Sequence, residues 1–211
     1  MRYIWINPVA ESMYEKSVLR EFLEKHQLYQ VQCDKDWGTI VKNKYYRESV
    51  GGGGSVADAR CPMAGELVKK VRAEEGGGCA GLRVADIEPI LLHCAREICG
   101  REDLKAGEKL ITTPCRSLAD MGNALGPDNT RFITWNGLLG ELGDMPEGRL
   151  PNASPIPPGF FEELGLRTES VTGKEEIEDY VRRGRWREVQ LTELLYCDQG
   201  CHNGDGVTED E

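Results

Sequence analysis

The chain has 211 residues, of which 39% are hydrophobic and 29% charged, and its formal net charge is −10. Lysine and arginine are scattered along this acidic chain, which excludes the basic footprint of a nucleic-acid-binding protein. No apolar run approaches membrane-spanning length, and "MRYIWINP" predicts a strand rather than a secretion signal, so we expect a cytoplasmic protein without membrane contact.

The first 50 residues predict strands that alternate with helices. "RYIWIN" (2–7) and "LYQVQC" (28–33) have the character of strands, and residues 11–26 between them place apolar side chains at helical spacing. A short helix is predicted at 37–41. We therefore assign residues 1–50 to an N-terminal α/β part.

Residues 51–55, "GGGGS", have the composition of an engineered flexible linker. As a Gly/Ser coil they would span roughly 12 Å. We predict that this linker replaces a native loop or inserted module, and we leave it out of the fold assignment. A natural glycine loop is the alternative.

Strands and helices continue to alternate over residues 56–207, and an acidic tail follows at 208–211. The predicted helices are 61–75, 85–100, 116–125, 136–143 and 173–184, and the predicted strands are 109–115, 130–135 and 188–195. This alternation predicts an α/β fold in which parallel strands are covered by helices.

Eight cysteines in a chain without a predicted secretion signal favour metal ligands, reactive thiols or small core residues over a disulfide framework. Cys61 and Cys115 each precede a predicted helix, and Cys197 follows a predicted strand. Loops at the carboxyl ends of parallel strands converge on one edge of a sheet. Cys201, in a polar loop rich in glycine, completes a set of four.

A set of four thiolates suits either a 4Fe–4S cluster or a zinc ion. Helix N-termini lower thiol pKa values, and we expect Cys61 and Cys115 to favour the thiolate for this reason. Because the four cysteines lack the paired spacing typical of structural zinc, the residues favour the iron–sulfur cluster and leave zinc open.

The remaining cysteines differ in their predicted roles. Cys94 and Cys99 are five residues apart and face different sides of a predicted helix, and Cys33 is predicted to be a small core residue. The glycines around Cys79 would let it approach the metal site. His202 is predicted to hydrogen-bond near that site, with a solvated side chain as the alternative.

Three segments resemble, in the same order, the cluster-binding motifs of the iron-only (FeFe) hydrogenase family, which lie in the C-terminal domain of the large hydrogenase chain. They are "ARCP", "ITTPC" and "TELLYCDQGCHNGDG", and "VTGKEEIEDYVRRGRWREVQ" also resembles the family's approach to its last motif. The likeness covers most of residues 57–207. It implies two small lobes of parallel-rich sheet covered by helices, with a 4Fe–4S cluster between the lobes held by Cys61, Cys115, Cys197 and Cys201.

The chain departs from this family at residues that serve the diiron unit. Arg60 stands where the family usually has a proton-relay cysteine, Leu118 where it has a lysine that donates to a cyanide, and Leu195 where it has a methionine. Glu193 matches the family's acid at the head of the last motif. The resemblance therefore implies the cluster without the diiron site.

Two arginines stand beside predicted ligands. Arg60 and Arg116 are predicted to offset the negative charge of a cluster bound by four thiolates, with solvated arginines as the simpler alternative. We expect a hydrogenase-like iron–sulfur protein in electron transfer, redox sensing or maturation, with a redox or maturation protein as partner. A divergent minimal hydrogenase, or another enzyme that uses an exposed cluster, is the second hypothesis, and a zinc-stapled interaction domain is the third.

Overall fold

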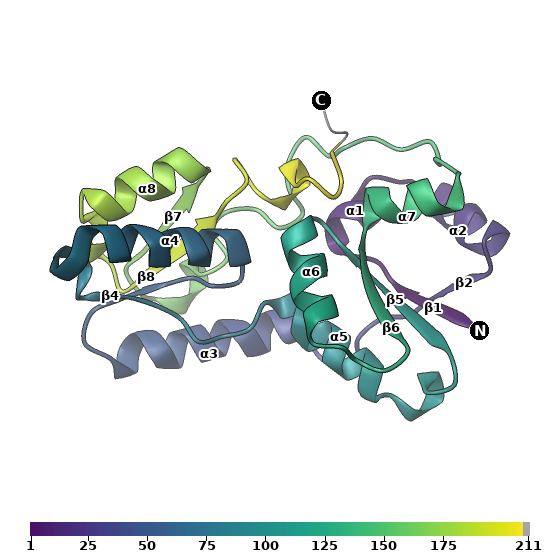
Figure 1. Ribbon diagram of the computed structural model, residues 1–211, viewed down its shortest axis with the longest axis horizontal. Helices are drawn as coiled ribbons and strands as arrows, with labels where there is room; N and C mark the ends of the chain where they lie inside the picture. The colour runs from purple at the N-terminus through teal and green to yellow at the C-terminus, as the bar shows by residue number, and fades with distance from the viewer. Residues whose placement is uncertain (209–211) are drawn as a thin grey trace. The chain divides into compact units, whose positions relative to one another are not determined.

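The structure is a computed structural model that describes residues 1–208, and the chain divides into two compact units (Figure 1). Unit 1 comprises Met1–Lys35, Leu91–Ile156 and the residues from Cys201 on, and unit 2 comprises Asp36–Ile90 and Pro157–Gly200. The N-terminal 50 residues thus contribute to both units. Of the predicted acidic tail, residues 209–211 lie outside the described residues.

Unit 1 is built on a four-stranded sheet in the order β2-β1-β5-β6, and every neighbouring pair is parallel. In this sheet Ile4 is in register with Leu110, and Ile111 with Phe132. Successive side chains of a strand point to opposite faces of the sheet, so these two pairs pack against helices on opposite faces. The strands are β1 (Arg2–Trp5), β2 (Leu28–Gln30), β5 (Glu108–Thr113) and β6 (Thr130–Thr134).

Helices cover the sheet of unit 1, and side chains at their N-termini fix where two of them begin. Asn7 accepts a hydrogen bond from the amide of Ala10, and Thr134 accepts one from Gly137, which caps α1 and α7. Gly122 of α6 lies directly against the ring of Phe132. The helices are α1 (Pro8–Ser12), α2 (Lys16–Lys25), α5 (Ile90–Gly100), α6 (Arg116–Ala124) and α7 (Trp135–Leu142).

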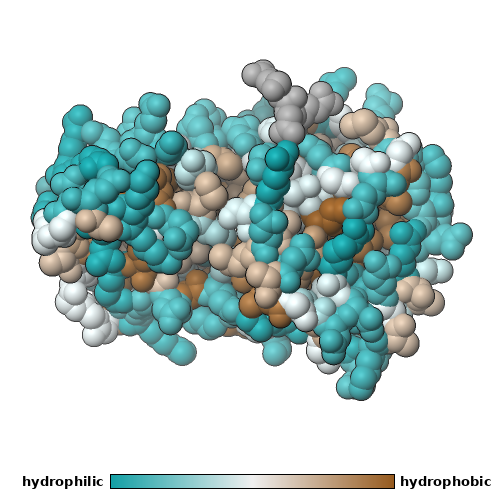
Figure 2. All heavy atoms as spheres, in the orientation of Figure 1, coloured by the Kyte–Doolittle hydropathy of each residue, from teal (hydrophilic) through white to brown (hydrophobic). Residues whose placement is uncertain are grey.

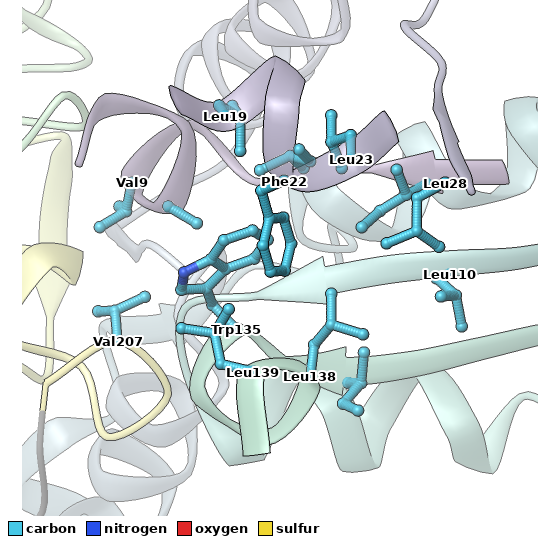
Figure 3. Close-up of a cluster of buried hydrophobic side chains, with 14 residues drawn as sticks. Val9, Leu19, Phe22, Leu23, Leu28, Leu110, Trp135, Leu138, Leu139 and Val207 are labelled. Atoms are coloured by element: carbon cyan, nitrogen blue, oxygen red, sulfur yellow. The ribbon is translucent and has the colours of Figure 1, made fainter. Parts of the chain in front are cut away.

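The core of unit 1 lies between its sheet and the layer formed by α1, α2 and α7. The rings of Phe22 and Trp135 meet at its centre, with centroids 5.9 Å apart (Figure 3). Val207, which is far along the chain, closes one side of this cluster (Figure 3). The C-terminal loop is therefore part of the core of unit 1.

Unit 2 has a second four-stranded parallel sheet, in the order β4-β3-β8-β7. Helices α4 and α8 cover one face and α3 covers the other (Figure 1). Each face has its own buried apolar cluster. The elements are α3 (Trp37–Gly51), β3 (Ser55–Ala57), α4 (Pro62–Glu75), β4 (Leu82–Val84), β7 (Thr168–Thr172), α8 (Lys174–Arg182) and β8 (Leu191–Leu195).

The expected α/β class with helix-covered parallel sheets is confirmed. Helix α3 runs to Gly51, ten residues beyond the predicted end at residue 41. Strands β3, β4 and β7 were not predicted. The first two are only three residues long, and the burial of β7 is centred on the single side chain of Val171.

The "GGGGS" segment is a tight connection between two elements. Gly51 ends α3 and Ser55 begins β3. Gly54 has φ +108°, and a Cβ at this position would lie 2.3 Å from the carbonyl oxygen of Gly81. Only glycine adopts this positive φ readily and also leaves room for the carbonyl of Gly81 without a shift of the backbone. The engineered origin of the segment stays a prediction.

The molecular surface agrees with the charged composition. On the face seen in Figure 2, hydrophilic residues predominate and apolar residues appear in small groups. Within residues 1–208, no helix is both long enough and apolar enough to cross a membrane.

Candidate metal centre

Cys61 lies in unit 2, where the chain passes from β3 into α4. It is the N-cap residue of α4, as its position before a predicted helix suggested, and the backbone amide of Tyr196, directly after β8, faces its sulfur. Because β3 and β8 are parallel neighbours, the loops that follow them lie at the same edge of the sheet. Unit 2 therefore carries two of the four predicted ligands, Cys61 and Cys197, on adjacent loops.

Two opposing effects act on the Cys61 thiol. Burial raises its pKa, while the backbone N–H groups of Tyr196, Ala64 and Met63 act in the opposite direction. The expectation of a net lowered pKa is wrong for Cys61 because burial outweighs the helix amides. A metal bound at this sulfur would supply the positive charge that the buried thiolate needs.

The loop that carries Cys197 is tied to the end of β7. The hydroxyl of Thr172 donates to Asp198 at 3.1 Å and accepts from the amide of Gln199 at 3.2 Å. Gln199 and Gly200 have φ values of 56° and 124°, so the chain reverses sharply after Cys197. These contacts fix the backbone on the carboxyl side of the predicted ligand.

Cys115 and Cys201 belong to unit 1, and the loop that begins at Cys201 contacts the backbone at Pro114 and Cys115. Cys115 follows β5 and is the N-cap residue of α6. The loop after Cys201 returns to this point, where the amide of Gly206 donates to the carbonyl of Pro114 at 3.1 Å. A Cβ at Gly204 would lie 2.4 Å from the same carbonyl oxygen. The glycines in this loop thus permit its close approach to the Cys115 backbone.

His202 is buried beside Cys201, with 6% of its surface exposed. Its Nδ1 atom is buried and has no hydrogen-bond partner among the described residues. A buried imidazole nitrogen normally has a partner. An acceptor or donor from a bound group would satisfy this atom, and the role of His202 near a metal site stays a prediction.

Arg60, the residue before Cys61, is turned into the protein. Its Nη2 atom lies 2.7 Å from an oxygen of Asp58 and 2.7 Å from an oxygen of Glu193. Its guanidinium also lies over the ring of Phe160, 4.0 Å from the centroid. The two carboxylates raise the pKa of Arg60 against the opposing effect of burial. The charge of Arg60 is thus neutralised by its own neighbours in unit 2.

Glu193 is the centre of this network and also shapes the covering loop. Its carboxylate accepts hydrogen bonds from the amides of Gly159 and Phe160, at 2.6 and 3.2 Å, and from the hydroxyl of Ser170 at 2.6 Å. The network was missed at the sequence level because Glu193 and Arg60 are 133 residues apart. The residues next to Glu193 in the sequence are uncharged, so they gave no sign that an arginine pairs with it.

Arg116, the second predicted arginine, is in a different environment. Its backbone amide donates to Asp205 at 3.0 Å, and its guanidinium lies 3.9 Å from the same carboxylate. Its side chain is 63% exposed. Arg116 therefore helps to tie the Cys201 loop to α6 while its charge faces solvent.

No disulfide joins any of the eight cysteines, all of which lie within residues 1–208. Cys79, expected to approach the metal site, is buried in the apolar cluster between the sheet of unit 2 and α4 and α8. The prediction that Cys33 is a small core residue is wrong, because its side chain is partly exposed, whereas Cys94 is buried within α5.

In the described part of the chain, no three His, Cys, Asp or Glu side chains converge as a metal site. The four predicted ligands are instead divided in pairs, Cys61 and Cys197 in unit 2 and Cys115 and Cys201 in unit 1. The molecule is thus an α/β protein with two parallel sheets, and each unit carries two of the four predicted ligands.

Neither a protein-family model nor a curated protein nor a solved structure matches this chain. The likeness of its three cysteine motifs to the iron-only hydrogenases is therefore a proposal that rests on the residues of the chain itself.

Proposed function

We propose that this chain is a hydrogenase-like protein that binds a 4Fe–4S cluster through Cys61, Cys115, Cys197 and Cys201. In this role it acts in electron transfer, redox sensing or maturation of a partner protein. The observation that carries the proposal is the repeated placement of cysteines. Each unit has one at the N-cap of a helix that follows a parallel strand, and a second on a tethered loop beside it.

The resemblance to the hydrogenases implies one cluster shared by two small lobes. The cluster would take two thiolates from each unit, and it would supply one-electron redox chemistry. The chain's own residues support such a group. Amides of Tyr196 and Ala64 face the sulfur of Cys61, and hydrogen bonds to cluster sulfurs tune the potential. The buried Nδ1 of His202, next in sequence to Cys201, is a further polar atom that a bound group would satisfy.

The contacts of Arg60 support a cluster protein without hydrogen chemistry. This residue occupies the family's proton-relay position, yet its guanidinium is held by Asp58 and Glu193. A permanently charged arginine in this ion pair does not release a proton at neutral pH. Leu118, at the position of the family's cyanide donor, is buried and apolar. Neither side chain can perform the step that the family assigns to its position.

The proposal is tested by anaerobic reconstitution with iron and sulfide. We expect about four iron and about four sulfide per chain, and a paramagnetic signal of a 4Fe–4S cluster after reduction. The variant Cys201→Ala should lose this signal. Cys99→Ala, which removes a cysteine of α5 outside the proposed ligand set, should keep it. Circular dichroism of both variants checks that each remains folded.

Other outcomes of the same experiment would replace the proposal. Colourless protein with about one zinc per chain would support a zinc-stapled domain. Carbonyl and cyanide infrared bands, after maturation by hydrogenase assembly factors, would support a hydrogenase. A folded Cys201→Ala variant that keeps the full cluster signal would overturn the ligand assignment.

A further inference from the structure

Two cysteines outside the proposed ligand set meet in unit 1. Cys33 follows β2, and Cys94 is buried within α5. The sulfur of Cys33 donates to the carbonyl oxygen of Cys94 at 3.8 Å, so the Cys33 thiol lies against the residue that carries the second thiol. Sequence reasoning missed this contact because the two residues are 61 positions apart.

The segment that carries Cys33 is fastened to α5 on both sides of the thiol. The amide of Asp34 donates to a carboxylate oxygen of Glu97 at 2.5 Å. On the other side, Arg101 donates to the carbonyl of Gln32 at 3.0 Å. These contacts hold the backbone on either side of Cys33 against α5 and the residue after it, so the placement of Cys33 beside Cys94 is fixed by unit 1 itself.

The two thiols have different environments. Cys33 is partly exposed, whereas Cys94 is buried. The hydrogen bond from Cys94 lowers the pKa of Cys33. The same contact, together with burial, raises the pKa of Cys94. A partly exposed thiol with a lowered pKa beside a buried thiol is the arrangement of an attacking and a resolving cysteine.

We propose that Cys33 and Cys94 form a redox-active dithiol that closes to a disulfide when it meets a low-molecular-weight disulfide such as oxidised glutathione. The Cys33 thiolate attacks the glutathione disulfide and forms a mixed disulfide, which releases one glutathione thiolate. Cys94 then gives its proton to the released glutathione thiolate, and its sulfur attacks the Cys33 sulfur and displaces the second glutathione as a thiolate, which is protonated by water. The two protein thiols are oxidised to one disulfide, and glutathione disulfide is reduced to two thiols.

The position of this pair gives the disulfide a structural effect. The chain leaves unit 1 after Lys35 and returns to it at Leu91. A bond between Cys33 and Cys94 would therefore close the first segment of unit 2 into a covalent loop. Closing a long loop restricts the unfolded chain, so oxidised protein should unfold at higher temperature than reduced protein.

Peptide mapping tests the pair directly. Reduced full-length protein is treated with oxidised glutathione under native conditions, remaining thiols are alkylated, and the protein is digested with trypsin. Cleavage after Lys and Arg separates Cys33 (peptide 26–35), Cys94 (84–96) and Cys99 (97–101). We expect the 26–35 and 84–96 peptides to be recovered joined by a disulfide, and dithiothreitol to separate them.

Matched variants distinguish this pair from non-specific oxidation. Cys94→Ser should lose the linked peptide and retain glutathione on Cys33, whereas Cys99→Ser, on the same helix, should keep the link. Cys201→Ala should also keep it, because the dithiol does not depend on the proposed cluster. Native protein whose 26–35 and 84–96 peptides stay alkylated, or are linked as often to other cysteines, would overturn the proposal.

Discussion

Arg60 lies among charges that are almost completely removed from water. The exposed fraction of its side chain is 7%, and those of Asp58 and Glu193 are 0% and 1%. Desolvation makes such a network costly to build, but removing one member is more costly still because it leaves the others unpaired. Arg60 is thus the counter-charge that allows two carboxylates to lie beside the sheet of unit 2.

We predict that Arg60→Met lowers the free energy of unfolding by about 3–5 kcal/mol, since it leaves two buried carboxylates without their partner. Arg116→Met is the matched control, because this arginine also lies beside a cysteine at a helix N-terminus but is exposed, and it should change stability by less than about 0.5 kcal/mol. Urea unfolding followed by circular dichroism measures both. Equal effects of the two substitutions would contradict a stabilising role for the Arg60 network.

Asp144 gives unit 1 a pH-dependent contact. Its carboxylate lies 2.8 Å from the ammonium group of Lys25 and 2.6 Å from His26, and these two partners, Lys25 first, lower its pKa. A carboxylate with a lowered pKa stabilises the folded state above its unfolded pKa of about 3.9, and this contribution is lost as the pH falls through the folded pKa.

The variant Asp144→Asn should therefore be less stable than the parent protein at about pH 7, and the difference should shrink towards zero at about pH 3. Asp120→Asn, which changes an exposed carboxylate of α6, serves as the control. Chemical unfolding at both pH values provides the comparison. A stability difference for Asp144→Asn that persists unchanged in acid would show that the charge of Asp144 is not its cause.

At the scale of elements, the loop after Cys201 can approach the N-terminus of α6 only because it contains glycine at the points of contact. A Cβ at Gly206 would lie 2.8 Å from the carbonyl carbon of Pro114 and 2.9 Å from the amide nitrogen of Cys115. These contacts are with backbone atoms, which cannot turn aside as a flexible side chain can. A substitution at Gly206 must therefore move either the loop or the N-terminus of α6.

Gly206→Ala should cost on the order of 1–3 kcal/mol because it forces this backbone apart. Gly140, on the exposed side of α7, has open space around it. Gly140→Ala should raise stability by about 0.5–1 kcal/mol, since alanine restricts the unfolded chain and favours the helix. Thermal unfolding of the two variants separates these effects. A neutral Gly206→Ala variant would refute the close packing of this loop.

The elements that could be predicted from the sequence are those with clear boundaries. Helix α4 begins at Pro62 and ends before a run of glycines, and α6 lies between Cys115 and the Gly126–Pro127 pair. Strands β3 and β4 escaped prediction because three residues are too few to establish an alternating pattern.

In the candidate site, only the features set by neighbouring residues in the sequence could be predicted. The N-cap positions of Cys61 and Cys115 follow from neighbouring residues and are confirmed. The partners of Arg60 depend on which strands become neighbours, and β3 meets β8 only through the sheet order of unit 2. Long-range contacts of this kind do not leave a periodic signal in one sequence.

For the whole molecule, the separate apolar cores are the main energetic feature. Unit 1 buries Leu138 in its cluster, and unit 2 buries Ile177 in another. The exposed fractions of these residues are 1% and 0%. Since each unit has its own sheet and its own buried cluster, we expect local opening in one unit to proceed without opening of the other.

Hydrogen exchange measured by mass spectrometry tests this independence. Leu138→Ala and Ile177→Ala should each cost about 2–5 kcal/mol in the unit that contains the residue. The first should speed exchange mainly in β1 and β5, and the second mainly in β3 and β8. Equal acceleration throughout the chain by either substitution would mean that the two units open as one.

The position of Val207 in the core of unit 1 has a consequence for biosynthesis. During translation, β1 emerges long before its partner β5, and the cluster beneath α2 cannot close until Val207 has left the ribosome. Early segments of the nascent chain must therefore wait with apolar surface exposed. Chaperones that shield such surface should be more important for this chain than for one whose units are completed in order.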